Sequence, residues 1–264
     1  MLRHPVTTGR SLRAAIPLLT LLVMAGCGSR DSTPPTDPAF ADRFLMERGN
    51  ETIAKRRWID AREYFRQIVE NYPQSAYRAD AKLAIADSYL GEGSAESLVL
   101  AANEYQEFLM FYPTHPRVDY AQFQVGMTYF DQMRAANRDQ TPTREALAQF
   151  DLFFRRYPNS PLTPQVKEKW RIARDRLSDD TYRVGLFYFR RSWCPGAASR
   201  FQEVIKEDPG FSRMDGVYYH LAECHALADN KAEAIPLFAR VVGEYETSEY
   251  FKDAQKRLEE LKAQ

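Results

Sequence analysis

Glycine and cysteine are scarce in this sequence, with 12 and 3 residues among 264, and neither charge sign is in excess. None of the glycines belongs to the G-x-x-x-x-G-K-S/T loop that cradles a nucleotide phosphate. The 36 basic residues are matched by 36 acidic ones, so there is no electrostatic reason to expect nucleic-acid binding. Strand-type alternation is rare. The composition therefore indicates a helical protein, in which 44% of the residues are apolar and available for a core.

The first 26 residues have the form of a lipoprotein signal peptide. A basic start leads into the apolar run 14–23, which is shorter than the roughly 20 residues that a membrane-spanning helix needs. The run ends in Met24-Ala25-Gly26-Cys27, which resembles the bacterial lipobox with Met24 in place of the usual Leu. We therefore expect cleavage before Cys27 and acylation of its thiol. The alternative is an ordinary secreted protein.

Residues 27–38 are predicted to be the lipidated cysteine and a flexible tether. The segment is polar and contains three prolines, so it cannot build a core. Acyl chains on Cys27 provide stable membrane anchoring. Gly28 stands where an Asp would favour retention in the inner membrane. These features favour the periplasmic face of the outer membrane.

One spacing recurs five times in the remaining sequence: an alanine, an aromatic residue four positions later and an apolar residue three positions after that. The copies are Ala61/Phe65/Ile68, Ala101/Tyr105/Phe108, Ala146/Phe150/Phe153, Ala197/Phe201/Val204 and Ala234/Phe238/Val241. Offsets of four and three put each trio on one helical face. Four of the copies are followed five residues later by a proline, which ends the helix.

A second pattern lies upstream of each trio, with a small residue followed three positions later by a ring in four of the five copies. The copies are Gly49/Thr52, Ala86/Tyr89, Gly126/Tyr129, Gly185/Tyr188 and Ala222/His225. A small residue allows two helices to approach closely. The two patterns together resemble the tetratricopeptide (TPR) repeat, in which stacked helix pairs share a core. A generic amphipathic helical bundle is the alternative.

We therefore predict an all-α, TPR-like solenoid of about five helix pairs plus one extra bridging helix over 164–177. The N-terminal half is expected over 39–160, and the bridging helix with the C-terminal half over 161–264. Asp179-Asp180 beside Ser178 resembles the start of a helix.

Two stretches resemble the ComL (BamD) family of outer-membrane protein assembly lipoproteins. They are Tyr157-Pro158-Asn159-Ser160-Pro161 and the segment from Tyr182 through Arg200-Phe201 to Val204. Asp208-Pro209 departs from the Tyr-Pro that ends other copies. The resemblance implies a non-enzymatic subunit of the β-barrel assembly machinery. Its partners would be the POTRA domain of a BamA-like protein, unfolded outer-membrane proteins and other Bam lipoproteins.

Two surfaces are candidates for these partners. By resemblance, the C-terminal half faces the POTRA domain, with Arg190, Arg191 and Arg200 as candidate contacts. In the N-terminal half, one side of a predicted first helix carries large apolar groups at offsets of three and four. These candidate client-binding residues are Tyr120, Phe123, Met127 and Phe130.

Other constellations indicate no cofactor and no catalysis. His220, Cys224 and His225 share a predicted helix, but His220 and His225 are five apart and do not form a metal-binding pair. Cys194 and Cys224 lie in adjacent copies, so they form either a disulfide or two separate buried thiols. The alternative function is another periplasmic TPR lipoprotein, such as a Tol–Pal or cell-envelope coordination factor. An enzyme such as a lytic transglycosylase would need an added catalytic domain.

Overall fold

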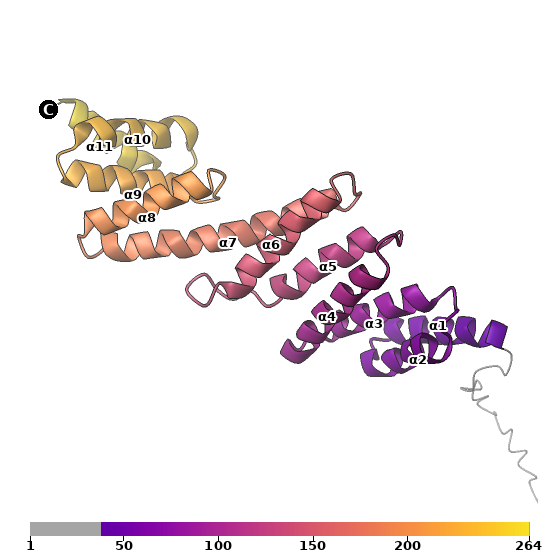
Figure 1. Cartoon of the computed structure of the whole chain (residues 1–264). Helices are drawn as coiled ribbons and strands as arrows, with labels where there is room; N and C mark the ends of the chain where they lie inside the picture. Colours follow the sequence, from indigo (N-terminus) through magenta and orange to yellow (C-terminus); the bar gives the residue numbers. More distant parts are fainter. Residues whose placement is uncertain (1–37, 264) are drawn as a thin grey trace, which may run out of the picture. The chain divides into compact units, whose positions relative to one another are not determined.

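The computed structural model describes residues 38–263, which form eleven α-helices and, within that range, no strand (Figure 1). The helices are α1 (Pro38–Ala54), α2 (Trp58–Asn71), α3 (Arg78–Glu92), α4 (Ala95–Phe111), α5 (Val118–Phe130), α6 (Thr141–Arg156), α7 (Thr163–Phe189), α8 (Cys194–Glu207), α9 (Met214–Leu227), α10 (Lys231–Glu244) and α11 (Phe251–Ala263). The predicted signal peptide and Cys27 lie outside these residues. Pro38, predicted to end the tether, is already the first residue of α1.

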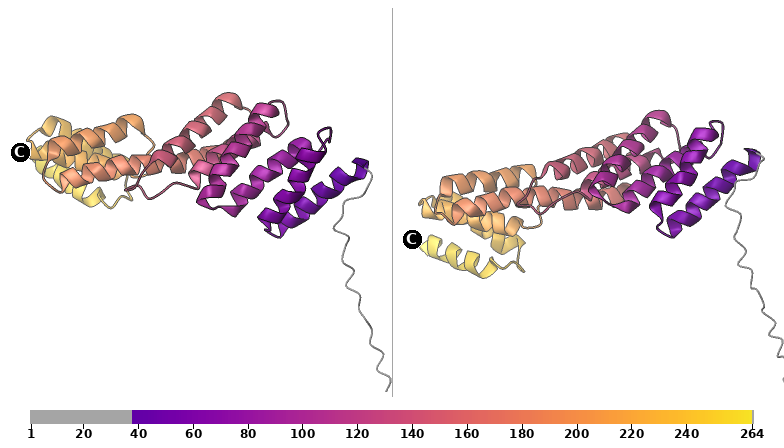
Figure 2. Two further views of the ribbon diagram at one scale, coloured as in Figure 1. Left: turned by 60° about the horizontal axis from the view of Figure 1, so that its bottom comes forward. Right: turned by 90° about the horizontal axis from the view of Figure 1, so that it is seen from below.

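Each helix packs against the next one in the chain, which gives five helix pairs from α1/α2 to α9/α10, followed by α11 (Figure 2). The prediction of an all-α TPR solenoid is confirmed. In addition to its neighbours in the chain, α7 contacts α5 and α9. It therefore connects the repeats before it with those after it.

The recurring trios form the centre of each repeat. All fifteen members lie on α2, α4, α6, α8 or α10, and each is at most 2% exposed. The small residues upstream lie against the aromatic rings of these trios. A Cβ atom added at Gly49 would come within 2.4 Å of Phe65, and one added at Gly126 within 2.4 Å of Phe150. Only a hydrogen fits at these two glycines, which explains the small residues of the second pattern there.

The extra segment is helical, but it is not a separate helix. It is the first half of α7, which continues without a break for 27 residues into the fourth repeat. The expected helix start at Ser178 is wrong. Ser178 is 6% exposed and donates to Asp208 Oδ2 at 2.6 Å, while Asp179 accepts from Arg213 at 2.8 Å. These side chains bind the loop that follows α8 and do not cap a helix.

An aspartate in the first helix of each repeat accepts a hydrogen bond from, or pairs with, the turn that follows the second helix. The pairs are Asp42–Ser75 at 2.6 Å, Asp80–His115 at 3.7 Å, Asp119–Ser160 at 2.6 Å, Asp175–Ser212 (backbone N) at 3.1 Å and Asp215–Ser248 at 2.6 Å. In the three Ser–Asp pairs the serine oxygen also accepts a backbone N–H two residues later. In every repeat this polar contact joins the first helix to the turn that follows the second helix.

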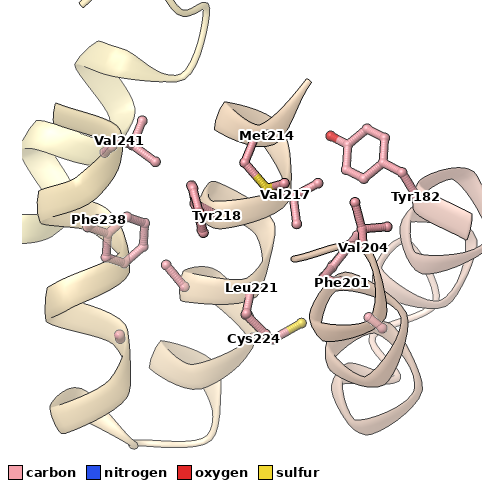
Figure 3. Close-up of a cluster of buried hydrophobic side chains, with 14 of the residues drawn as sticks. Tyr182, Phe201, Val204, Met214, Val217, Tyr218, Leu221, Cys224, Phe238 and Val241 are labelled. Carbon is pink, nitrogen blue, oxygen red and sulfur yellow. The ribbon is translucent and has the colours of Figure 1, made fainter. Parts of the chain in front are cut away.

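The core of the C-terminal half is built from α7, α8, α9, α10 and α11, and Figure 3 shows part of it. Tyr182 and Phe201 are fully buried there, with ring centroids 5.8 Å apart. Met214 and Val217 of α9 contribute to the same cluster. The side chains of the five helices from α7 to α11 thus share a single apolar cluster.

Candidate protein-binding surfaces

A half-buried carboxylate links three helices of the N-terminal half. Asp87 of α3 accepts hydrogen bonds from the hydroxyls of Tyr105 in α4 at 2.6 Å and Tyr120 in α5 at 2.9 Å. The Arg117 guanidinium lies 3.7 Å from the same carboxylate and 4.5 Å over the Tyr120 ring. Burial raises the pKa of Asp87, although the two hydroxyls and Arg117 oppose this shift. Tyr120 is therefore held in place at both its ring and its hydroxyl.

Burial, followed by the charge of Asp87, raises the pKa of Tyr120 to about 12. The phenol consequently stays neutral and donates its proton to Asp87 at physiological pH. Its ring is only partly buried, so one side remains accessible. Tyr120 thus combines an accessible aromatic surface with a fixed orientation.

The other three predicted client-binding residues differ in accessibility. Phe123 is 8% exposed and packs with its ring centroid 6.1 Å from that of Phe150. Met127 and Phe130 are partly buried along the same cluster, and Phe130 also lies 5.6 Å from the Lys169 ammonium. Phe123 therefore lies beneath the surface to which Tyr120, Met127 and Phe130 contribute.

The corresponding side of α1 and α3, the first helices of the two preceding repeats, also carries apolar residues. Leu83 is fully buried, and Met46 and Ile53 are partly buried. Arg43 is exposed and donates to Glu47 at 2.9 Å. Met46 and Ile53 thus have the same intermediate burial as Tyr120, Met127 and Phe130.

The three candidate arginines of the C-terminal half are all exposed. Arg190 follows the last residue of α7, and the Arg191 guanidinium lies 3.6 Å over the ring of Phe187. Arg200 donates to Glu203 at 2.7 Å within α8. The side chains are accessible to a partner, and the Arg200–Glu203 pair is an exposed contact within one helix.

Two exposed aromatic residues beside these arginines were missed by sequence reasoning. Phe187 is 47% exposed and Trp193 is 53% exposed, and both lie against Tyr188 with centroid distances of 5.5 and 4.8 Å. Trp and Arg are the residue types most enriched at interface hot spots. The available signal was a pair of aromatic residues outside the repeat positions, next to Arg190-Arg191.

His220 packs within an aromatic cluster. Five rings lie within 6.1 Å of its own, including Phe189 at 5.0 Å and Tyr250 at 5.2 Å. Its Nδ1 lies 2.6 Å from the Gly216 carbonyl oxygen, and burial lowers its pKa. Within residues 38–263 no group of three His, Cys, Asp or Glu side chains is arranged to hold a metal ion. The geometry supports a packing role for His220.

No helix in the described part of the chain is both long enough and apolar enough to span a bilayer. The accessible features described above are surfaces on the outside of a helical repeat array, and they suit protein partners better than a small substrate.

Comparison with known proteins gives two family matches. The model of the YfiO family, described as outer membrane lipoprotein, matches residues 39–227. A tetratricopeptide repeat model matches residues 217–248, which include α10 and most of α9. The first match spans α1 through α9, and therefore includes both candidate surfaces.

Several curated proteins are similar along most of their length. The outer membrane protein assembly factor BamD of Caulobacter vibrioides is 26% identical over 229 residues, covering 84% of this chain and 73% of that protein. The factor of the same name from Vibrio cholerae is 26% identical over 202 residues, covering 73% and 81%. Among solved structures, the TPR2AB domain of yeast Sti1 aligns with 14% identity and a TM-score of 0.46, covering 84% and 83%.

Proposed function

The chain belongs to the YfiO family of outer membrane lipoproteins, and from that premise we propose that it is a non-enzymatic subunit of the outer-membrane β-barrel assembly machinery. The observation that carries the proposal is the family match over 39–227, which includes the repeats that present both surfaces. The protein is an outer membrane lipoprotein, and we place its repeats on the periplasmic side.

In this proposal the C-terminal half contacts a POTRA domain of a BamA-like protein. Arg190, Arg191 and Arg200 are exposed and carry positive charge toward the partner. Phe187 and Trp193 add exposed aromatic area next to Arg191. Charged groups at such an interface guide association, and aromatic groups with arginine supply much of the binding energy.

The partner surface is tested by charge reversal. Arg200→Glu is expected to reduce co-purification of the POTRA-containing protein from detergent-solubilised membranes, because reversal at an interface charge costs on the order of a few kcal/mol. The matched control is Arg57→Glu. Arg57 is also exposed and pairs at 2.7 Å with an acid three residues later. Exposed pairs of this kind contribute little to stability, so both variants should fold.

Recovery of the partner at wild-type levels with Arg200→Glu would count against the C-terminal surface. Recovery of Tol–Pal components in place of a β-barrel assembly protein would favour the alternative function. Both results come from the full, lipidated chain.

We further propose that the N-terminal half binds unfolded outer-membrane proteins through Tyr120, Met127 and Phe130, with Phe123 as the buried support. Outer-membrane β-barrel chains that end in an aromatic residue offer a ring to such a surface. The fixed Tyr120 ring loses little conformational entropy on binding. Lys169 beside Phe130 adds a positive charge for the terminal carboxylate.

The client surface is tested by fluorescence titration of a peptide carrying a C-terminal β-barrel signal. Tyr120→Ala/Phe130→Ala is expected to weaken binding, whereas Met110→Ala/Phe111→Ala is expected to leave it unchanged. The control pair is also apolar, at 64% and 62% exposure, but lies on α4. Circular dichroism first confirms that both variants are folded. Equal affinity of the two double variants would place the client surface elsewhere.

A further inference from the structure

Two cysteines from adjacent repeats meet in the C-terminal core. Cys194 is the first residue of α8, and Cys224 lies in the last turn of α9. Cys224 is 3% exposed and belongs to the apolar cluster between these helices, and Cys194 packs against the same cluster. In Figure 3 the Cys224 sulfur points from α9 toward α8. Both residues are free thiols in the structure.

The two thiols pack against the same apolar cluster, where α8 begins and α9 ends. Burial raises the pKa of the Cys224 thiol, and the hydrogen bond between this thiol and Cys194 raises it further. Cys224 therefore keeps its proton. The two helices that carry the thiols, α8 and α9, pack against each other.

The surroundings of the two thiols differ. Cys194 is half-buried and directly follows the exposed turn formed by residues 190–193. A reagent in solvent reaches Cys194 from this turn, whereas Cys224 is covered by the core. One thiol is thus accessible, and the other is a buried neighbour.

We propose that Cys194 and Cys224 form a disulfide in the mature protein, which joins the fourth repeat covalently to the fifth. Outer membrane lipoproteins mature in the cell envelope, where disulfides form and persist. The proposal rests on this location and on the packing of both thiols against one cluster at the adjoining ends of α8 and α9, and it is independent of the proposed partners.

The chemistry requires an oxidant that itself carries a disulfide, either a small molecule or a protein. The Cys194 thiolate attacks one sulfur of that disulfide, and the other oxidant sulfur leaves as a thiolate. The Cys224 thiol then loses its proton, and its sulfur displaces the second oxidant sulfur from Cys194. Two S–H bonds are lost, one S–S bond forms in the protein, and the oxidant is reduced to two thiols.

Such a crosslink constrains the unfolded chain. It closes a loop from residue 194 to residue 224, and loops of this length stabilise the folded state mainly by limiting the unfolded ensemble. We expect the oxidised protein to melt roughly 5–10 °C above the reduced protein. The added stability is located at the contact between α8 and α9.

The test uses the full lipidated chain, purified from membranes without reductant after free thiols have been blocked with an alkylating reagent. Trypsin cuts after Arg191, Arg200, Arg213 and Lys231 and so places the two cysteines in separate peptides, 192–200 and 214–231. The expected result is a single crosslinked species of both peptides, which separates into its two components on reduction. Two alkylated peptides without prior reduction would overturn the proposal.

Melting curves give an independent readout. The wild type should lose several degrees on reduction, whereas Cys194→Ser and Cys224→Ala should melt at the same temperature with or without reductant. An identical melting temperature for oxidised and reduced wild type would overturn the stabilising role. The peptide analysis needs only the wild-type chain, so it stands even where a variant fails to fold. Neither measurement involves a partner protein, so its outcome is separate from that of the proposed function.

Discussion

Gly185 of α7 lies directly against the ring of Phe201 in α8, and a Cβ atom added at Gly185 would come within 2.5 Å of the Phe201 Cε1 atom. Phe201 is fully buried, and its ring also packs against Tyr182, with ring centroids 5.8 Å apart, so it has little room to move. The same relationship joins Gly49 to Phe65 and Gly126 to Phe150. At these three positions the two helices can pack this closely because glycine has no side chain.

We predict that Gly185→Leu destabilises the fourth repeat by about 3 kcal/mol or more, because overpacking of a filled core is costly. Thermal melting followed by circular dichroism measures the effect. Gly243→Leu is the control, since Gly243 is also helical and has no atom within 4 Å of an added Cβ. A side chain there should leave stability unchanged or raise it slightly. Equal melting temperatures for the two variants would mean that the crossing can relax.

The core of each repeat was predictable from the sequence because it depends on local offsets. Spacings of four and three put Ala197, Phe201 and Val204 on one helical face wherever the helix packs. The small residues were predictable for a related reason, since a recurring glycine or alanine before a recurring ring indicates a close approach. These features need no knowledge of distant contacts.

The continuity of α7 was not predictable in the same way. Ser178-Asp179-Asp180 has the composition of a helix start. In the structure, however, Ser178 donates to Asp208 and Asp179 accepts from Arg213, so neither side chain caps a helix. Those partners lie about 30 positions further along the chain, beyond the reach of any local pattern. Tertiary contacts therefore override the local preference.

The candidate surfaces were only partly predictable. Offsets of three and four define a stripe on α5 that is wider than the accessible strip, so they do not separate Phe123, at 8% exposure, from Tyr120. Phe187 and Trp193 lie outside the repeat pattern, which is why periodicity did not indicate them. Predicting which residues are accessible on either surface requires the positions of the neighbouring helices.

The buried carboxylate of Asp208 leads to a second prediction. Asp208 is 3% exposed and accepts from Arg171 at 2.9 Å and Ser178 at 2.6 Å, in the position where other repeats carry a tyrosine. Asp208→Ala leaves both donors without this acceptor. We expect a loss of about 2 kcal/mol in the free energy of unfolding, because unsatisfied buried donors are costly and Arg171 is partly solvated. Urea unfolding measures it.

The control for this variant is Asp60→Ala, which removes an exposed carboxylate paired with Arg57. It should cost less than about 1 kcal/mol. Burial alone would raise the pKa of Asp208, but the hydrogen bonds from Arg171 and Ser178 outweigh it and the net pKa is lowered. Its contribution to stability is therefore present above the ordinary value of 3.8 and is lost as the pH falls through the folded-state pKa. A wild-type acid transition unchanged in Asp208→Ala would contradict this role.

The membrane anchor gives a third prediction. Cys27→Ala removes the acyl acceptor that the lipobox-like sequence provides, so the protein should appear in the soluble fraction or as an uncleaved precursor. Palmitate labelling followed by membrane fractionation measures the change. Cys194→Ala is the control and should keep the label, because Cys194 lies within the folded repeats. Label that persists in Cys27→Ala would place the acyl group elsewhere.

The fourth prediction concerns Tyr120 at alkaline pH. Its pKa is raised to about 12 by burial and by the charge of Asp87, whereas a tyrosine in the unfolded chain ionises near 10. The stability gained from keeping this phenol neutral is fully present below pH 10 and is lost as the pH rises through about 12. Tyr120→Phe should therefore flatten the fall in stability over this interval.

The Tyr120→Phe variant also removes one of the two hydroxyl donors to Asp87. Because Asp87 keeps the 2.6 Å hydrogen bond from Tyr105, the variant should lose only about 1 kcal/mol at pH 7. Tyr72→Phe is the control for the mutation itself. Urea unfolding at pH values from 7 to 12 compares the three proteins, and tyrosinate absorbance follows the ionisation directly. A Tyr120→Phe profile that falls as steeply as the wild type above pH 10 would show that another group carries the alkaline transition.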